Sequence, residues 1–221
     1  MRIKILENGP YIVTGNIPLK EMIITPKGHH YEFVEGRKLP QSEEYHLCRC
    51  GRSSNAPFCD GSHVHSGFNG HETASKKPYL ERLVDVQQGH TMQLADDGRC
   101  AFARFCHRDG GSIWELTDED QRPVNHDEAL KAAHDCVAGR LTMYDLEGNV
   151  LEETFEPEII ILQDPERHAS AGIFVKGPII IEGADGVEYE VRNRVALCRC
   201  GASQNKPFCD ASHINVRYRD R

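Results

Sequence analysis

The apolar residues of this chain fall in short runs bounded by glycine and proline, a pattern typical of β-strands. Residues 7–15 and 175–183 match each other, because each stretch contains a Gly-Pro pair, then a short run typical of a strand, and ends on a glycine. Further strands are predicted in each half, at 30–34 and 44–47 in the first and at 188–192 and 195–197 in the second. The two outer parts of the chain are therefore predicted to be related β-rich modules.

The residues between these modules contain one helical pattern, in which apolar side chains recur three and four positions apart. Asn125 is predicted to cap this helix, with Glu128 as its capping-box partner and Gly139 beyond its end. Strands are predicted on either side of it, at 91–94 and 140–144. The apolar face of the helix comprises Ala129, Leu130, Ala133, Cys136 and Val137.

These patterns together predict an α+β, β-rich fold in three parts. The expected parts are a first module at 1–66, an inserted segment at 67–165 and a second module at 166–221. A chain of 221 residues can form one large domain or a few small ones. Its longest apolar runs are the length of a strand and well below the roughly 18 residues of a membrane helix, so no membrane partner is expected.

The main chemical signal is a spacing of metal-binding residues, C-x-C-x8-C-x3-H, that occurs twice without an insertion. The two sets are Cys48, Cys50, Cys59 and His63, and Cys198, Cys200, Cys209 and His213. Three thiolates and one imidazole suit a soft metal, either a zinc ion or an iron–sulfur centre. The Cys-x-Cys pair is tighter than usual zinc ligand pairs, but the residues alone leave both metals open.

The residues around these ligands predict a local backbone as well. Pro57 and Pro207 are expected to begin short helices on which the last cysteine and the histidine share one side. Because Ala211 occupies the position of Gly61, a helical backbone is expected there, not a left-handed one.

The run Cys59-Asp-Gly-Ser-His63, with Cys48-x-Cys50 upstream, resembles the signature of the CDGSH, or mitoNEET-type, iron–sulfur proteins. The second copy is similar, with alanine in place of the glycine. The resemblance implies a [2Fe–2S] cluster at each motif, with the Cys-x-Cys pair on one iron and the remaining cysteine and histidine on the other. It also implies that the two motifs pair as an internal pseudo-dimer, from which the middle segment emerges.

A histidine ligand should alter the chemistry of such a cluster. A neutral imidazole in place of a thiolate removes one negative charge, which is expected to raise the reduction potential. A protonated imidazole cannot bind metal, so acid is expected to loosen the cluster at His63 and His213.

Three further cysteines, Cys100, Cys106 and Cys136, lie in the middle segment. This stretch resembles the cluster-binding segment of divergent single-cluster ferredoxins. It departs from that pattern because the second cysteine of the run is absent and Val137, not proline, follows Cys136. Two interpretations stay open: a third cluster, [3Fe–4S] or [4Fe–4S], or a ferredoxin-like fold that retains only buried thiols.

Charge and cysteine usage narrow the functional classes. The net charge of −8 argues against a nucleic-acid partner. With no secretory signal, the nine cysteines are expected to stay reduced in a cytoplasmic protein.

The preferred hypothesis is a monomeric, non-enzymatic carrier that passes electrons to a redox partner or a cluster to an apo iron–sulfur acceptor. One alternative is an interaction module that structural zinc stabilises. The other is the electron-delivering component of an enzyme complex, in which the acidic surface of this chain would steer docking.

Overall fold

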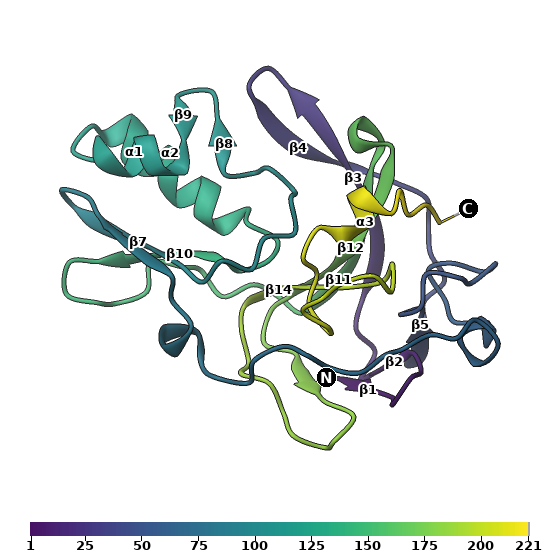
Figure 1. Ribbon diagram of the computed structural model, residues 1–221. Coiled ribbons are helices and arrows are strands. Elements are labelled where there is room, and N and C mark those ends of the chain that lie inside the picture. The colour runs from purple at the N-terminus through teal and green to yellow at the C-terminus, as the bar shows by residue number, and fades with distance from the viewer. Residues whose placement is uncertain (221) are drawn as a thin grey trace.

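The structure, a computed structural model, describes residues 1–220 and is built mainly from two sheets (Figure 1). The four-stranded sheet has the order β13-β1-β2-β5 and consists of β1 (Arg2–Ile5), β2 (Tyr11–Thr14), β5 (Glu44–Leu47) and β13 (Ile180–Glu182). The five-stranded sheet has the order β14-β12-β11-β3-β4 and consists of β3 (Leu19–Lys27), β4 (His30–Glu35), β11 (Glu158–Asp164), β12 (Ala169–Lys176) and β14 (Arg194–Leu197).

Each of these sheets combines strands from both ends of the chain. In the first, β1 pairs in parallel with β13, so that Ile3 lies opposite Ile181. In the second, β3 pairs in parallel with β11, so that Lys20 lies opposite Ile160. The two modules therefore share their sheets, as an internal pseudo-dimer does. β11 belongs to the shared sheet although it lies before residue 166, the expected start of the second module. The boundaries of the three parts remain predictions.

The middle of the chain forms a smaller α+β unit, seen on the left of Figure 1. Its sheet has the order β10-β7-β6 and comprises β6 (Asp85–Gln88), β7 (Met92–Asp96) and β10 (Leu141–Asp145). Beside it lie α1 (Ile113–Asp118), α2 (Pro123–His134) and the two-residue strands β8 (His107–Arg108) and β9 (Gly111–Ser112). Met92, Leu94, Ile113 and Leu116 are buried together in a core of its own. The strands predicted on either side of the helix are confirmed as β7 and β10.

The ends of the predicted helix differ from expectation. α2 begins at Pro123 with Arg122 as its N-cap, and it ends at His134. Asn125 therefore lies inside the helix, while Glu128 accepts a hydrogen bond of 2.8 Å from Arg108 Nε. Proline suits the first helical position because its missing N–H would have no partner there. A capping box does occur in this unit, at α1, between Ser112 and Glu115.

The strand predicted at 188–192 is also absent, apart from an isolated bridge between Glu188 and Glu182. This stretch instead contacts the inserted unit. Glu190 accepts a hydrogen bond of 2.7 Å from the backbone N–H of Tyr79, and the Arg192 guanidinium lies 3.7 Å from the centre of the Tyr79 ring. Side-chain contacts with the insert have replaced the strand pairing that the alternating pattern indicated.

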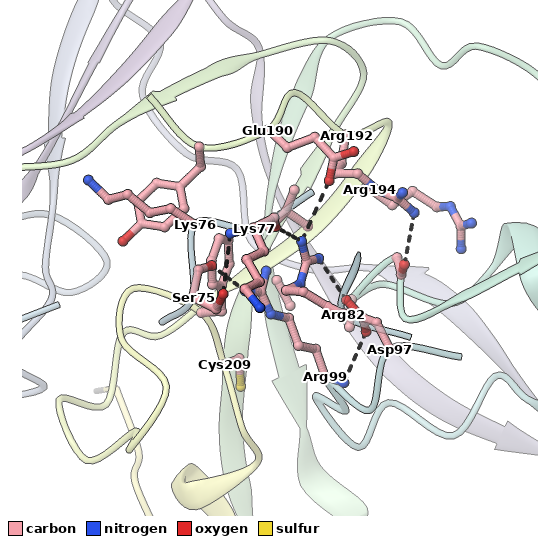
Figure 2. Close-up of a pocket in the computed structure, with 16 residues that line it drawn as sticks. Ser75, Lys76, Lys77, Arg82, Asp97, Arg99, Glu190, Arg192, Arg194 and Cys209 are labelled. Atoms are coloured by element: carbon pink, nitrogen blue, oxygen red, sulfur yellow. Dashed lines mark hydrogen bonds and ion pairs between the residues drawn. The ribbon is translucent and has the colours of Figure 1, made fainter. Parts of the chain in front are cut away.

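Arginine side chains hold the insert against the second module through hydrogen bonds and ion pairs. Arg194 of β14 is 2% exposed and donates to the carbonyl oxygens of Ala133, Cys136 (2.9 Å) and Leu141 (3.0 Å). Figure 2 shows Arg82 lying between Asp97, at 2.8 Å, and Glu190, at 3.6 Å. The insert is therefore held against the second module by contacts distributed along both parts.

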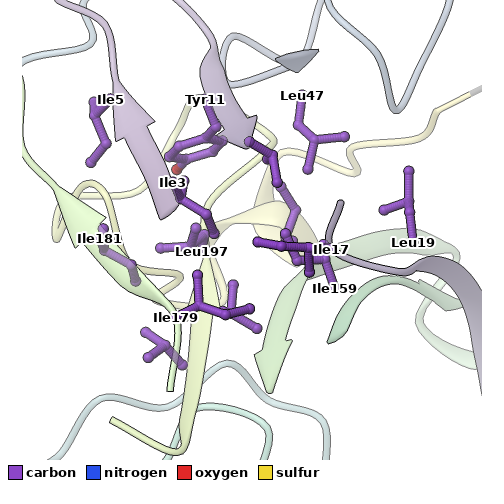
Figure 3. Close-up of a cluster of buried hydrophobic side chains, with 14 of the residues drawn as sticks. Ile3, Ile5, Tyr11, Ile17, Leu19, Leu47, Ile159, Ile179, Ile181 and Leu197 are labelled. Atoms are coloured by element: carbon purple, nitrogen blue, oxygen red, sulfur yellow. The ribbon is translucent and has the colours of Figure 1, made fainter. Parts of the chain in front are cut away.

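A single apolar core joins the two outer modules (Figure 3). Alternate residues of β1, such as Ile3, pack with Tyr11 of β2 and with Ile179, Ile181 and Leu197 of the second module, each no more than 2% exposed. Burying one such side chain contributes about 1.5–3 kcal/mol. Each module therefore depends on the other for a complete core.

The remaining helical turns are short. They are Ser62–Val64, Tyr79–Glu81 and Pro165–Arg167, which are 3-10 turns, and α3 (Ser212–Asn215). Within residues 1–220, no helix combines the length and the apolar character needed to cross a bilayer.

Candidate metal centres

The first ligand set lies where β5 leaves the four-stranded sheet. Leu47, the last residue of β5, forms an antiparallel bridge with Phe58. The N–H of Cys48 donates to the Pro57 carbonyl at 2.8 Å, and the N–H of Cys59 donates to the His46 carbonyl at 2.9 Å. This bridge places Cys48 and Cys59 on adjacent chain segments, although many residues separate them in sequence.

The second ligand set repeats this arrangement at the end of β14. Leu197 bridges to Phe208. The N–H of Cys198 donates to the Pro207 carbonyl at 2.8 Å, and the N–H of Cys209 donates to the Ala196 carbonyl, also at 2.8 Å. The sequence repeat is therefore also a repeat of backbone geometry.

Within each set the four donor atoms fall into two pairs. The Sγ atoms of Cys48 and Cys50 are 3.6 Å apart, as are those of Cys198 and Cys200. The second pair joins Cys59 Sγ to His63 Nδ1 at 3.4 Å, and its equivalent joins Cys209 to His213 at the same distance. Two ligands on one tetrahedral metal, with bonds of about 2.3 Å to sulfur and about 2.1 Å to nitrogen, lie roughly 3.6–3.8 Å apart.

This pairing bears on the choice between zinc and a diiron centre. Among the described residues, no group of three or more cysteine, histidine, aspartate or glutamate side chains converges so that it could hold one metal ion. A structural zinc ion needs four ligands around one point, whereas a sulfide-bridged diiron cluster takes two ligands on each of two irons. The two donor pairs of each set fit a sulfide-bridged diiron cluster, which takes two ligands on each iron.

Each motif contains an aspartate that secures the loop around the ligands. Asp60 accepts hydrogen bonds from the N–H groups of Ser54 (2.8 Å) and Ser62 (3.0 Å). Asp210 likewise accepts from Gln204 (2.7 Å) and Ser212 (3.0 Å). Hydrogen bonds from Ser62 and Ser54 hold the pKa of the Asp60 carboxyl well below its ordinary value, so it stays ionised.

The serine three residues after each Cys-x-Cys pair ties the loop to the residue before the last cysteine. Ser53 Oγ donates to the Phe58 carbonyl at 2.6 Å, and Ser203 Oγ donates to the Phe208 carbonyl at 2.7 Å. These serines recur at matching positions in both copies, a signal that could have identified them from the sequence.

Two backbone expectations for the motif were wrong. Gly61 has φ +87° and Ala211 has φ +67°, so both lie in the left-handed region, and alanine occupies it at a cost of about 1 kcal/mol or more. This reversal ends the ligand loop and starts a new turn, which brings the histidine back toward the last cysteine.

The prolines also differ from expectation. Pro57 and Pro207 do not begin helices but follow cis peptide bonds in the loop before Cys59 and Cys209. The helical turns start only at Ser62 and Ser212, so the last cysteine and the histidine of each motif do not share a helix.

The two centres differ in the exposure of their Cys–His pairs, although Cys50 of the first is buried and Cys200 of the second is partly exposed. Cys59 and His63 are partly exposed, whereas Cys209 and His213 are 3% and 2% exposed. Residues of the insert, among them Arg82 and Arg99, lie beside Cys209 (Figure 2) and line two cavities next to it, of about 20 Å³ and about 440 Å³. The Arg99 guanidinium lies 4.2 Å from the centre of the Phe208 ring.

Burial has a direct effect on the histidine of the second centre. It lowers the pKa of His213 to about 4, so the ring is neutral at neutral pH and can offer a nitrogen lone pair. The other ring nitrogen, Nε2, is buried and has no hydrogen-bond partner among the described residues. A neutral imidazole whose Nδ1 faces a thiol is suited to binding a metal.

A buried arginine stands between the first two cysteines of each motif. Arg49 donates to the carbonyl oxygens of Leu6, Gly9 and Gly70 at 2.7–3.1 Å. Arg199 donates to the Leu162 and Ala171 carbonyls, both at 2.8 Å, and forms an ion pair with Asp220 at 2.5 Å. Arg199 therefore has a carboxylate partner, whereas Arg49 is held by carbonyl oxygens. Arginine recurs at the same position of both motifs, a sequence signal by which these residues could have been found.

The middle cysteines gather in one region of the insert. Burial raises the pKa of Cys106 to about 12, and negative charge on Cys136 and Cys100 adds to the effect. Cys100 Sγ accepts a hydrogen bond of 3.3 Å from the N–H of Phe102. A cavity of about 650 Å³ beside them is lined by Cys100 and Cys106 and by arginines that include Arg140.

The duplicated fold and the paired thiolate and imidazole donors define a protein with two matched metal centres. Comparison with protein families agrees with this, because the family described as iron-binding zinc finger, CDGSH type, matches residues 8–64 and 172–214. The chain therefore carries two CDGSH-type iron-binding domains, as the motif predicted. No curated protein and no solved structure matches the chain.

Proposed function

We propose that the chain binds two [2Fe–2S] clusters and acts as a non-enzymatic carrier of electrons or of clusters. The ligands are the two sets of three cysteines and one histidine, Cys48, Cys50, Cys59 and His63, and Cys198, Cys200, Cys209 and His213. The observation that carries the proposal is the arrangement of each set as two donor pairs, with separations of 3.6 Å and 3.4 Å.

Such a cluster would accept or release one electron at a time, and the residues around it would set its potential. Histidine in place of a fourth cysteine reduces the negative charge of the ligand set and favours the reduced state. The partner would be a cytoplasmic redox protein or an apo iron–sulfur acceptor, and the chain would act as a monomer.

A third cluster in the insert is a finer proposal, favoured by the loop from Cys100 to Cys106. Phe102 and Arg104 have φ values of +59° and +69°, which are uncommon for residues other than glycine. Left-handed residues at every second position of a loop turn successive backbone N–H groups toward one side, as in loops that surround iron–sulfur centres. Cys136 would provide the third thiolate, and Arg140 would offset part of the charge.

The test is the iron and acid-labile sulfide content of anaerobically purified protein, together with its visible and EPR spectra. Two clusters correspond to about four irons per chain, and a third centre would add three or four. Preparations that are colourless, free of labile sulfide and loaded with zinc would overturn the proposal.

Two variants separate the sites in this experiment. Cys198→Ser should remove about half of the iron from the outer pair and leave the signal of the insert unchanged. Cys136→Ser should remove only the signal beyond the two [2Fe–2S] clusters. If Cys136→Ser leaves the iron content and the spectra unchanged, the insert holds no third cluster.

A further inference from the structure

The ligand loops of the two modules meet each other. A Cβ atom built on Gly51 would lie 2.4 Å from the carbonyl oxygen of Cys200, and one built on Gly201 would lie 2.7 Å from that of Cys50. Both glycines have positive φ values, +70° and +79°. The two Cys-x-Cys loops are therefore in backbone contact, and the two centres open toward a common region of the surface.

A groove of about 480 Å³ lies where these loops meet, and Cys50 and Cys200 form part of its wall. Four cationic side chains line it: Arg52, Lys206, Arg217 and Arg219. Of the described residues that line this groove, none is acidic. The chain as a whole has 34 acidic and 26 basic residues, so this face has the opposite sign to the protein's net charge of −8.

The charges of the groove are not neutralised by their own contacts. Lys206 Nζ donates to the Ser203 carbonyl at 2.7 Å, and Arg219 Nε donates to the His168 carbonyl at 2.9 Å. A carbonyl oxygen satisfies the donor without cancelling its charge. Arg52 and Arg217 are exposed, so their charges reach the solvent.

These four residues differ from the buried arginines that stand between the paired cysteines, Arg49 and Arg199. Arg49 and Arg199 are 3% and 1% exposed, and their guanidinium groups donate to buried carbonyl oxygens. The cations of the groove face outward, where they act on approaching molecules. Exposed charges of one sign attract the opposite sign over about 8 Å at physiological ionic strength and raise association rates.

We propose that this basic groove is the surface on which an acidic face of the redox partner protein docks, so that electrons pass at Cys50 and Cys200. The inference rests on the proposed function and adds the class of partner to it. It also replaces the expectation from the net charge, because the face that carries the ligands would select an acidic surface and not a basic one.

The experiment uses the reduced holoprotein and two one-electron oxidants, anionic ferricyanide and cationic tris(phenanthroline)cobalt(III). In each reaction a reduced cluster loses one electron and the metal of the oxidant gains it, with no bond formed or broken. Stopped-flow absorbance measures the rate at low and high salt. We expect ferricyanide to react faster at low salt than at high salt, despite the negative net charge of the protein. Poly-L-glutamate should inhibit this reaction, because it competes for the groove.

Charge reversal supplies the matched comparison. The double variant Arg52→Glu/Arg217→Glu should slow ferricyanide at least tenfold at low salt and remove the inhibition by poly-L-glutamate. The control, Lys27→Glu/Lys131→Glu, changes the net charge equally at two exposed residues outside the groove and should change the rate less than twofold.

Equal effects of the two double variants, or ferricyanide rates that do not fall with salt, would overturn the docking proposal. Iron and sulfide are measured in every sample. Protein that contains its clusters but shows no preference for the anionic oxidant contradicts only the docking proposal. Protein without clusters contradicts the proposed function itself.

Discussion

The single hydroxyl hydrogen of Tyr11 is shared between two carbonyl oxygens, those of Cys198 at 2.7 Å and of Pro207 at 3.0 Å. A buried side chain of the first module thus holds the ligand loop of the second. The matching residue of the second module is Ile179, which has no hydroxyl, so this link has no counterpart. The two centres are therefore connected through the shared core as well as at the surface.

Replacing Tyr11 with phenylalanine should lower the free energy of unfolding by about 1–3 kcal/mol, because the buried Cys198 carbonyl loses its hydroxyl donor, while the Pro207 carbonyl keeps the Cys198 N–H. It should also loosen metal binding at the second centre, which chemical denaturation and iron retention would measure. Tyr45→Phe is the matched control, because its hydroxyl is also buried but bonds to the Ile17 carbonyl at 2.9 Å, in its own module. If both variants lose iron equally, the hydroxyl of Tyr11 has no particular role at the second centre.

Gly51→Ala should destabilise the protein by about 2 kcal/mol or more, because its new Cβ would meet the Cys200 carbonyl in addition to the left-handed strain. Gly61→Ala is a close comparison, since Gly61 also has a positive φ but has nothing within 4 Å of the added atom. It should cost about 1 kcal/mol, and Ala211 already occupies that position in the second motif. Equal losses in thermal unfolding would contradict the close contact between the ligand loops.

The first centre should lose its iron before the second, because Cys59 and His63 are partly exposed and Cys209 and His213 are buried. Iron from these two centres should therefore be released to a chromogenic chelator in two phases of similar amplitude. Arg99→Ala removes part of the insert beside the second centre and should speed only the slower phase. A single phase that is unaffected by this substitution would mean that exposure does not control release.

The apo protein should lose stability as the pH falls from about 6.5 toward 4. Burial lowers the pKa of His213 from 6.5 to about 4, so in this window the unfolded chain binds a proton that the folded chain does not. The loss should approach about 3 kcal/mol near pH 4 and then level off. His213→Gln should flatten this part of the pH profile, measured by urea denaturation; an unchanged profile would show that another group is responsible.

Local patterns predicted much of the site and of the secondary structure. The ligand spacing identified the iron-binding motifs, and the strands that lead into Cys48 and Cys198 occur as β5 and β14. These features depend on residues close together in the sequence, which set both the strand pattern and the donor atoms. The left-handed backbone at Ala211 was missed, because propensity disfavours it and only the closure of the ligand loop imposes it.

The sequence by itself determined the donor chemistry and the duplication, because these follow from residue types at short, fixed spacings. Only the tertiary structure decided which Cys–His pair is buried, how β1 pairs with β13 and where basic residues gather above the ligand loops. Those properties arise from contacts between segments far apart in the chain, such as Gly51 against Cys200 or Arg99 against Phe208. Such contacts form only when the two modules and the insert pack together, so no local pattern encodes them.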